Sequence, residues 1–121
     1  MKREEIIANN KLIAEFLGFV NTTPNDRDFD IMEHPTTKKL VEPASMKHHK
    51  SWDELMPVVE KINKELYLID ILYTLNSTKV LIKLNYNNEI IAEGYTESFN
   101  SLDAVYNAVV QFIKWWNENN S

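Results

Sequence analysis

The stretch LYLIDILYTLNSTKVLIKLNYNNEIIAEGYT, residues 66–96, decides the fold that the sequence predicts. It contains three runs rich in branched and aromatic residues, separated by Asn76–Thr78 and by the pair Asn87 and Asn88. Such runs between turn residues are typical of strands joined by hairpins, so we predict a three-stranded antiparallel meander. Adjacent asparagines favour a type I′ turn, which needs positive φ at both central residues, and we expect a tight second hairpin.

Alternation within these runs predicts how the sheet is covered. In the middle run, apolar residues at even positions alternate with a mixed set at odd positions, which gives one apolar and one mixed face. The first run is apolar on both faces apart from Asp70 and Thr74, so we expect it to be the central or best-covered strand. We interpret Asp70 as a tied or edge-facing acid in preference to a catalytic one.

Three helices are expected around this sheet. The last runs from about Ser101 to Asn117, where apolar residues recur at increments of three and four. At about 1.5 Å per residue it spans roughly 25 Å, enough to lie across three strands. The first helix begins near Glu4 and should stop at Gly18, because a glycine adopts the left-handed conformation there and lets Phe19 fold back toward Ile13.

The second helix is expected to begin at Ser51, within the stretch SWDELMPVVEKI. Ser51 and Glu54 match a capping box, in which each side chain bonds the backbone N–H of the other residue. Pro57 would be the sixth helical residue, so it predicts either a kink or a short first turn followed by a new helix. In both versions we expect Trp52 and the apolar stripe of this helix to reach the same core.

Residues 21–50 have a different character from the rest of the chain. They contain three of the four prolines and show no sustained periodicity, which predicts an irregular segment. A structureless segment of about thirty residues is unusual, so it is functional, disordered or hiding short strands. We expect an outer strap, available to another molecule, around one domain of residues 1–121. The predicted class is α+β: a three-stranded antiparallel meander packed with three helices, in the order α-loop-α-β-β-β-α.

The composition restricts the function classes. The 121 residues are 44% apolar and carry a formal charge of −5, which is typical of a globular chain and disfavours nucleic acid as a partner. The absence of cysteine excludes disulfides, thiolate nucleophiles and Cys-based zinc sites. No signal-peptide pattern and no run of about 20 apolar residues occurs, so we expect a cytoplasmic protein without a membrane partner.

Common catalytic and metal-binding motifs are absent from the sequence or incomplete in it. The three histidines, His34, His48 and His49, all lie in residues 21–50 without the HExxH spacing of a zinc site. The stretch DRDFDIMEHPTT begins like a calcium loop, but it has Ile31 where glycine and Thr37 where glutamate is required. No GxSxG, Walker or GxGxxG motif occurs. We therefore expect no catalytic residue, metal or cofactor.

Two further features concern partners. Lys38 and Lys39, with the run of residues 47–50, form the basic cluster of the chain near Trp52, which leaves nucleic-acid binding as a lesser alternative. Trp115 and Trp116 are adjacent on the last helix, so they cannot be equally buried there, and Trp116 follows the apolar stripe. Trp115 is then a candidate exposed anchor for a partner, or it packs on the first helix or a terminus. The candidate partner-binding residues are Phe29, His34, His48, His49, Trp52 and Trp115.

Three motifs, NNKLIAEFLGF, SWDELMPVVEKI and AVYNAVVQFIKWWNE, resemble a family of short proteins from phages and prophages of Bacteroidetes. They cover residues 9–19, 51–62 and 104–118, and the family is similar in layout to phage α/β/α-sandwich domains. The resemblance supplies no catalytic residues. It implies a non-enzymatic accessory protein in the host cytoplasm that binds a host or phage protein, for example to inhibit an antiviral defence. A metal-assisted hydrolase that uses the histidines and nearby acids is the alternative, and a homodimer is left open.

Overall fold

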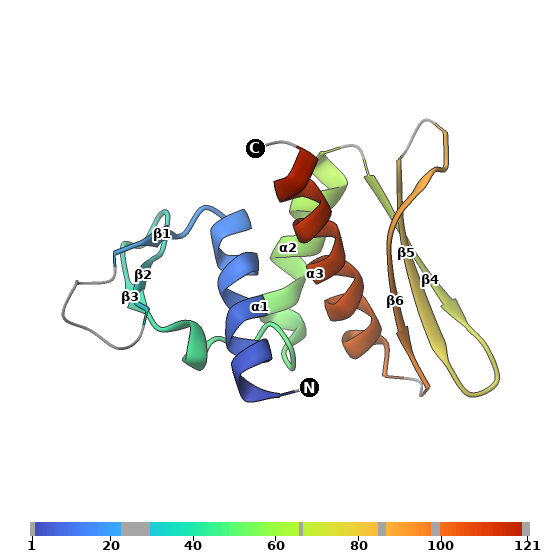
Figure 1. Ribbon diagram of the computed structural model, residues 1–121, viewed down its shortest axis with the longest axis horizontal. Coiled ribbons are helices and arrows are strands. Elements are labelled where there is room, and N and C mark those ends of the chain that lie inside the picture. The colour runs from blue at the N-terminus through green and yellow to red at the C-terminus, as the bar shows by residue number, and fades with distance from the viewer. Residues whose placement is uncertain (1, 23–29, 66, 85–86, 98–99, 120–121) are drawn as a thin grey trace.

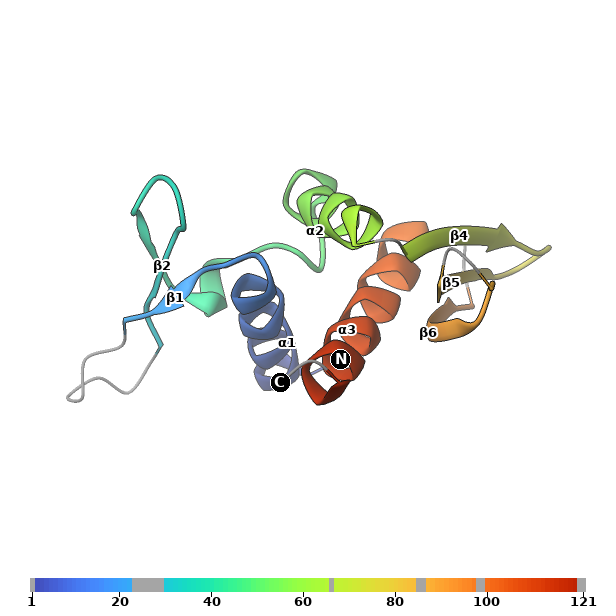
Figure 2. The ribbon, with the colours of Figure 1, turned by 90° about the horizontal axis from the view of Figure 1, so that it is seen from above.

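A computed structural model describes residues 2–22, 30–65, 67–84, 87–97 and 100–119. In this part of the chain three α-helices and two three-stranded antiparallel sheets follow in the order α-β-β-β-α-β-β-β-α, which confirms the predicted α+β class. The larger sheet lies at one end with α3 beside it, and α2 packs against both α3 and the first strand of that sheet. Helix α1 lies on the far side of α3, and the small sheet lies at the other end (Figures 1 and 2). The helices are α1 (Arg3–Phe16), α2 (Trp52–Lys64) and α3 (Ser101–Asn119). The strands are β1 (Val20–Asn21), β2 (Met32–Glu33), β3 (Leu40–Val41), β4 (Tyr67–Tyr73), β5 (Thr78–Leu84) and β6 (Ile90–Thr96).

The predicted meander is confirmed, but the predicted place of its first run is wrong. Strands β4, β5 and β6 lie in the three expected runs and pair in the order β4-β5-β6. Strand β5 is therefore central, and β4 is an edge strand whose Leu72 and Tyr73 are exposed. An apolar strand needs a cover on both faces, but that cover can come from another molecule, so its composition does not fix its place in the sheet.

The second hairpin is wider than the two-residue type I′ turn predicted for Asn87 and Asn88. The Leu84 N–H donates to the Glu89 carbonyl at 2.9 Å, and of the two asparagines only Asn88 has positive φ, at 59°. One left-handed residue therefore serves a longer connection. Next to it the register shifts between β5 and β6, because Ile82 pairs with Ala92 while Lys83 pairs with Ile90. This β-bulge leaves residue 91 without a partner on β5.

Helix α3 lies across the sheet as predicted, and its backbone touches β6 at Gly94. A Cβ at this position would lie 1.9 Å from the Ala104 carbonyl oxygen and 2.6 Å from the Ala108 nitrogen. Glycine on the strand and alanines on the helix therefore allow an unusually close approach. From this contact α3 diverges from β6 toward its C-terminal end (Figure 1). None of the described helices is both long and apolar enough to span a membrane.

The end of α1 confirms the predicted role of Gly18. Gly18 has a φ of 97°, its N–H donates to the Glu15 carbonyl at 3.0 Å, and the Phe19 N–H donates to the Ala14 carbonyl at 2.9 Å. These two bonds form a Schellman motif. Phe19 does not join Ile13, because its ring packs with a second apolar cluster that contains Ala14. The apolar core is consequently divided into two clusters.

The segment predicted to be irregular contains a second sheet. Strands β1, β2 and β3 pair antiparallel, and a 3-10 turn, η1 (Pro43–Ser45), follows them. Each strand has two residues, which is too short for an alternating pattern to appear in the sequence. Met32 and Met46 are buried in the second cluster with Ala14 of α1. The segment is therefore packed through a small core of its own at one end of the molecule.

The start of α2 differs from the prediction in three respects. The helix is continuous through Pro57, so the alternative of a new helix beginning there is wrong. Ser51 is the N-cap residue, yet its side chain makes no capping bond, and the Glu54 carboxylate instead accepts from the Lys47 N–H at 3.0 Å. The predicted capping box is therefore wrong. Trp52 is 40% exposed, so it does not reach the core as expected.

Candidate functional site

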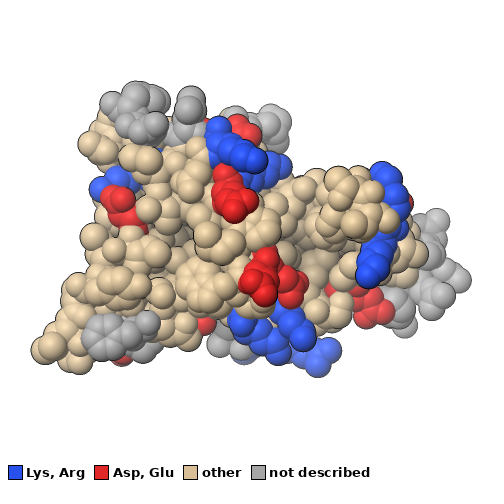
Figure 3. All heavy atoms as spheres, turned by 180° about the vertical axis from the view of Figure 1, so that it is seen from behind, with Lys and Arg blue, Asp and Glu red and all other residues tan. Residues whose placement is uncertain are grey.

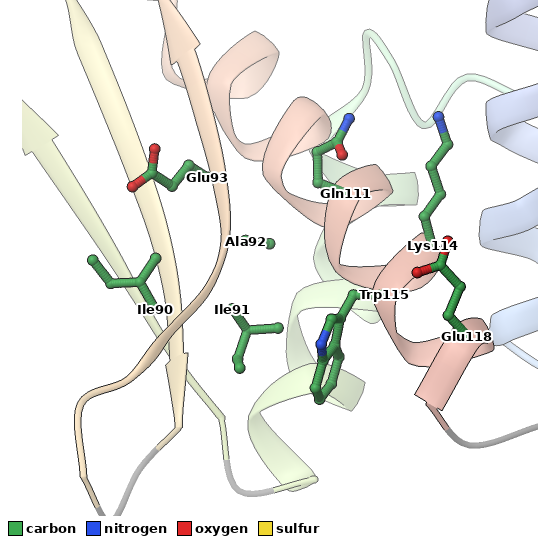
Figure 4. A pocket seen from close by; sticks show the side chains of 8 residues that line it. All are labelled: Ile90, Ile91, Ala92, Glu93, Gln111, Lys114, Trp115 and Glu118. Carbon is green, nitrogen blue, oxygen red and sulfur yellow. The ribbon is translucent and has the colours of Figure 1, made fainter.

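A groove of about 800 Å³ lies between β6 and the C-terminal half of α3 (Figure 4). Residues 90–93 of β6 form one wall, and Gln111, Lys114, Trp115 and Glu118 of α3 form the other. Its volume is within the range of small-molecule and peptide sites, about 300–1,000 Å³. The groove opens where α3 has diverged from the close contact at Gly94.

Trp115 and Ile91 form the apolar floor of this groove, where their side chains point toward each other (Figure 4). Trp115 is half-buried, and its ring centroid lies 6.0 Å from that of Phe112 and 6.1 Å from that of Tyr67. Ile91 is partly buried against the same core because the β-bulge turns it toward α3. The floor is therefore held by the core while one side of it faces solvent.

The wall formed by β6 is also an edge of the sheet, since β5 is the one strand that pairs with β6 in the described part of the chain. The Leu84 N–H points toward β6. Every second residue of a strand directs its backbone N–H and C=O to the same side, so the backbone groups of Ile82 also point toward β6. Its partner Ala92 thus directs its backbone groups toward β5. Glu93, the next residue, must direct its N–H and C=O away from the sheet. An edge strand presents such groups as a template for an additional strand.

Charged and polar side chains form the rim of the groove. Lys114, Glu118 and Gln111 lie on the α3 side, whereas Glu93 points to the opposite face of β6 (Figure 4). On the groove side the charges of Lys114 and Glu118 cancel, and the Glu93 carboxylate adds a negative charge on the other face of β6. These lining residues include no histidine, serine or cysteine, so the groove offers binding chemistry without a nucleophile and base pair.

A buried polar network connects α1, α3 and the segment after η1. The Tyr106 hydroxyl donates to Asn10 Oδ1 at 3.0 Å, and Asn10 Nδ2 donates to the Met46 carbonyl at 3.1 Å and to His49 Nδ1 at 3.3 Å. Burial raises the pKa of Tyr106 to about 12, so the phenol stays neutral. Every polar atom of the Asn10 side chain has a partner, and the network holds the segment in place.

Two smaller hollows adjoin this network and share Ile6 and His49. One, of about 460 Å³, carries basic side chains from Arg3, Lys47 and Lys50. The other, of about 350 Å³, includes Thr96, Asp103 and Asn107. The pKa of His49 is lowered from 6.5, mainly by burial and next by the charge of Lys50. Part of the predicted basic cluster thus surrounds one hollow.

The structure spreads the predicted partner-binding residues over several elements. His34 follows β2, and its Nδ1 accepts the N–H groups of Thr36 and Thr37 at 3.2 and 3.1 Å, so it stabilises the turn before β3. Trp52 is exposed at the start of α2. Trp115 lines the groove beside β6. The prediction for Phe29 lies outside the described residues.

His48 is the most buried of the histidines. Its Nδ1 lies 3.0 Å from the Glu54 carbonyl, and because a carbonyl only accepts, Nδ1 carries the proton. Nε2 is buried and has no hydrogen-bond partner among the described residues. Burial lowers the pKa of His48 from 6.5, which outweighs the opposing effect of Glu54. The ring therefore stays neutral at neutral pH.

The histidines and acids do not converge on a metal site in the described part of the chain, where no three His, Asp or Glu side chains are grouped to hold an ion. Asp30, from the stretch that begins like a calcium loop, pairs with Lys11 at 3.0 Å. Asp26 and Asp28 of that stretch lie outside the described residues.

Sequence reasoning indicated Trp115 but missed the other parts of the groove. The adjacent pair Ile90 and Ile91 interrupts the strand alternation, which is a signal for a bulge. Gly94 is the other signal, since a glycine inside a strand often marks a close backbone approach.

Comparisons of the chain with models of protein families, with curated proteins and with solved structures find no match. The resemblance to phage proteins therefore stays an expectation from the three sequence motifs.

Proposed function

We propose that this chain is a non-enzymatic binding module that takes an extended segment of another protein into the groove beside β6. The observation that carries the proposal is the free edge of β6, which runs along a groove whose floor is the aromatic ring of Trp115. Recognition by strand addition combines main-chain hydrogen bonds with pockets for alternate side chains, and this groove supplies both.

The geometry defines the kind of segment that fits. A strand added to β6 exchanges hydrogen bonds with the outward backbone groups of Glu93, and its side chains alternate between the two faces of the sheet. The inward residues lie on Trp115 and Ile91, so they are apolar. The outward residues lie near the Glu93 carboxylate, which favours Lys or Arg. The partner is therefore an extended segment with alternating apolar and basic residues.

Within this proposal, the partner is a host or phage protein and the role is that of an accessory protein, for example one that inhibits an antiviral defence. The motivation for that part is the resemblance of the three sequence motifs. No described cluster favours the metal-assisted hydrolase. The basic hollow at Arg3 gives nucleic acid a place to bind, but its volume suits a small ligand better than a strand.

A peptide library displayed on phage tests the proposal directly, because it requires no knowledge of the natural partner. Selection against the wild-type protein should enrich peptides with alternating apolar and basic residues. Replacing Trp115 by alanine should weaken binding of a selected peptide about 10-fold or more, since an aromatic anchor at the centre of an interface contributes about 2 kcal/mol. The matched control is Trp52→Ala, which removes an exposed tryptophan from α2.

Trp115 contacts the core, so a second variant leaves the core intact. Gln111 is exposed on the groove wall, and Gln111→Trp fills the groove without changing a buried residue. We expect this variant to lose peptide binding while its unfolding midpoint stays unchanged. The proposal is wrong if no peptide is enriched, or if the Trp52→Ala control weakens binding as much as the groove variants.

A further inference from the structure

Strand β4 exposes an apolar surface at the edge of the sheet opposite β6. Leu68, Ile71, Leu72 and Tyr73 of β4, with Leu75 in the following turn, have exposed fractions between 39% and 84%. Seen from behind, the end of the molecule that carries this sheet is largely uncharged (Figure 3). Leu68 and Leu72 lie on one face of the sheet and Ile71 and Tyr73 on the other, so apolar side chains are exposed on both sides of this edge. Clustered exposed apolar side chains mark an interaction site.

This edge lacks the features that usually keep sheet edges apart. Natural edge strands carry unpaired charges, prolines or bulges that block pairing with another chain. In β4 the sequence YLIDILY has one charge, Asp70, and that carboxylate pairs with Lys83 of β5 at 2.9 Å. The only charge of the strand is thus held by its own sheet. The backbone of β4 is available to a further strand.

The hydrogen-bond pattern shows which residues face that further strand. The Thr74 N–H donates across the turn to the Ser77 carbonyl at 3.0 Å, so it points toward β5. Because the direction alternates, the backbone groups of Ile69, Ile71 and Tyr73 point away from the sheet. In an antiparallel copy of β4, outward-facing residues must pair with outward-facing residues, which are the odd-numbered ones. The midpoint between two odd-numbered residues is always a residue position, so a two-fold axis must pass through a residue and not between two residues.

Axes through any of residues 69 to 73 satisfy this rule, and the side chains distinguish the three in the middle of that range. An axis at Asp70 places two carboxylates opposite each other, which is destabilising. An axis at Ile71 places Asp70 opposite Leu72 of the second copy. An axis at Leu72 places Asp70 opposite a Thr74 hydroxyl, Leu72 opposite itself and Ile71 opposite Tyr73. Aromatic residues opposite branched ones are favoured cross-strand pairs, so the axis at Leu72 is the best.

The exposed area is sufficient for a dimer. Five apolar side chains that each expose roughly 100 Å², about half the area of a large side chain, give about 500 Å² per copy. If pairing covers all of this area, two copies bury about 1,000 Å², which is the size that a predicted interface should reach.

We propose that two copies of this chain pair through β4, antiparallel about a two-fold axis at Leu72, to form one six-stranded sheet. Such an interface is closed, because each copy uses the same edge and the dimer leaves no β4 free. Strand β6 lies at both outer edges of the joined sheet, so the two grooves stay open. The dimer is independent of the proposed function of the groove, and it would present two grooves to a partner.

Sedimentation equilibrium of the full chain tests the dimer. The wild-type protein at about 0.1 mM should have twice the monomer mass. Leu72→Lys should be monomeric with an unchanged circular dichroism spectrum, because a lysine on an edge blocks pairing. The matched control Tyr95→Lys changes a side chain of similar exposure, 55% against 46%, on β6 and should stay dimeric. A monomeric wild type, a dimeric Leu72→Lys or a monomeric Tyr95→Lys overturns the proposal.

The absence of cysteine allows a second test of the axis. Opposite residues of a non-hydrogen-bonded antiparallel pair have Cα atoms about 4.5 Å apart, within the range of a disulfide. With copper–phenanthroline and oxygen as the oxidant, Leu72→Cys should form a cross-linked dimer within minutes, whereas Asp70→Cys and Tyr95→Cys should not. Faster cross-linking of either control than of Leu72→Cys overturns the proposed pairing.

Discussion

Replacing Gly94 by alanine should destabilise the protein by about 3 kcal/mol. The added Cβ would lie 1.9 Å from the Ala104 carbonyl oxygen, and ordinary contacts begin at 3.4 Å, so helix or strand must move by 3.4 − 1.9 = 1.5 Å. The three atoms nearest the added carbon all belong to the backbone of α3, which cannot rotate away as a side chain would. Overpacking typically costs 1–3 kcal/mol, and the rigid neighbours place this site at the upper end.

Urea unfolding followed by tryptophan fluorescence, at fixed protein concentration, measures this cost. Glu93→Ala is the matched control, because it changes the neighbouring exposed residue and should cost less than about 0.5 kcal/mol. Adding Ala104→Gly to the Gly94 variant should not restore stability, since the obstacle is a carbonyl oxygen and not a methyl group. A Gly94→Ala variant within 0.5 kcal/mol of the wild type would refute the close contact between α3 and β6 from which the groove derives.

Two further predictions concern the buried polar groups. Tyr106→Phe should lower the free energy of unfolding by about 1–3 kcal/mol, because Asn10 Oδ1 then lacks its donor, while Tyr95→Phe on the exposed face should change it little in the same urea assay. Burial lowers the pKa of His48, so below its ordinary value of 6.5 the unfolded chain binds the proton more readily than the folded chain. The urea midpoint should therefore fall as the pH falls from about 7.5 to 5.5. It should fall less in His48→Asn, whose side-chain amide keeps a hydrogen-bond donor for the Glu54 carbonyl. Equal falls in both proteins would contradict the claim that the His48 ring is held neutral by burial.

The parts of the fold that the sequence predicts are those long enough to show a period. Strands β4 to β6 have seven residues each and α3 has nineteen, so alternation and helical spacing are visible in them. Gly18 also predicts the end of α1, because few residues other than glycine adopt a positive φ. The strands of the small sheet have two residues each, and no pattern in them distinguishes a strand from a loop.

The wrong predictions have a common physical origin. The residue type tells whether a side chain favours burial or a hydrogen bond, but it does not tell which neighbour provides them. The apolar composition of β4 indicates a need for cover, but the strand lies at an edge where that cover is missing within the chain. The histidines carry no metal motif in the sequence, but the sequence does not reveal their partners either: His34 accepts turn N–H groups and His48 donates to a carbonyl. Glu54 suits a capping box, but its carboxylate accepts the N–H of Lys47 instead.

The candidate groove could be predicted only in part. Trp115 is indicated because adjacent residues point in different directions on a helix, but the expectation that Trp116 alone packs inward is wrong: both rings are partly buried beside Tyr67 and Phe112. The opening beside it depends on the angle between α3 and β6, which is set by the contact at Gly94 and by the bulge at Ile91. Both are tertiary features. The glycine at position 94 and the adjacent isoleucines 90 and 91 indicate where they occur, but the sequence does not determine the angle between α3 and β6.

The most direct measurement of the central claim is the hydrogen exchange of β6 amides with and without a library-selected peptide. Strand addition predicts that the amide of Glu93, which points away from the sheet, exchanges at least 10-fold more slowly when the peptide is bound, and that the Trp115 indole signal shifts. The amide of Ala92 points toward β5 and should change less. A bound peptide that leaves the Glu93 amide unprotected would contradict the claim that β6 receives an additional strand.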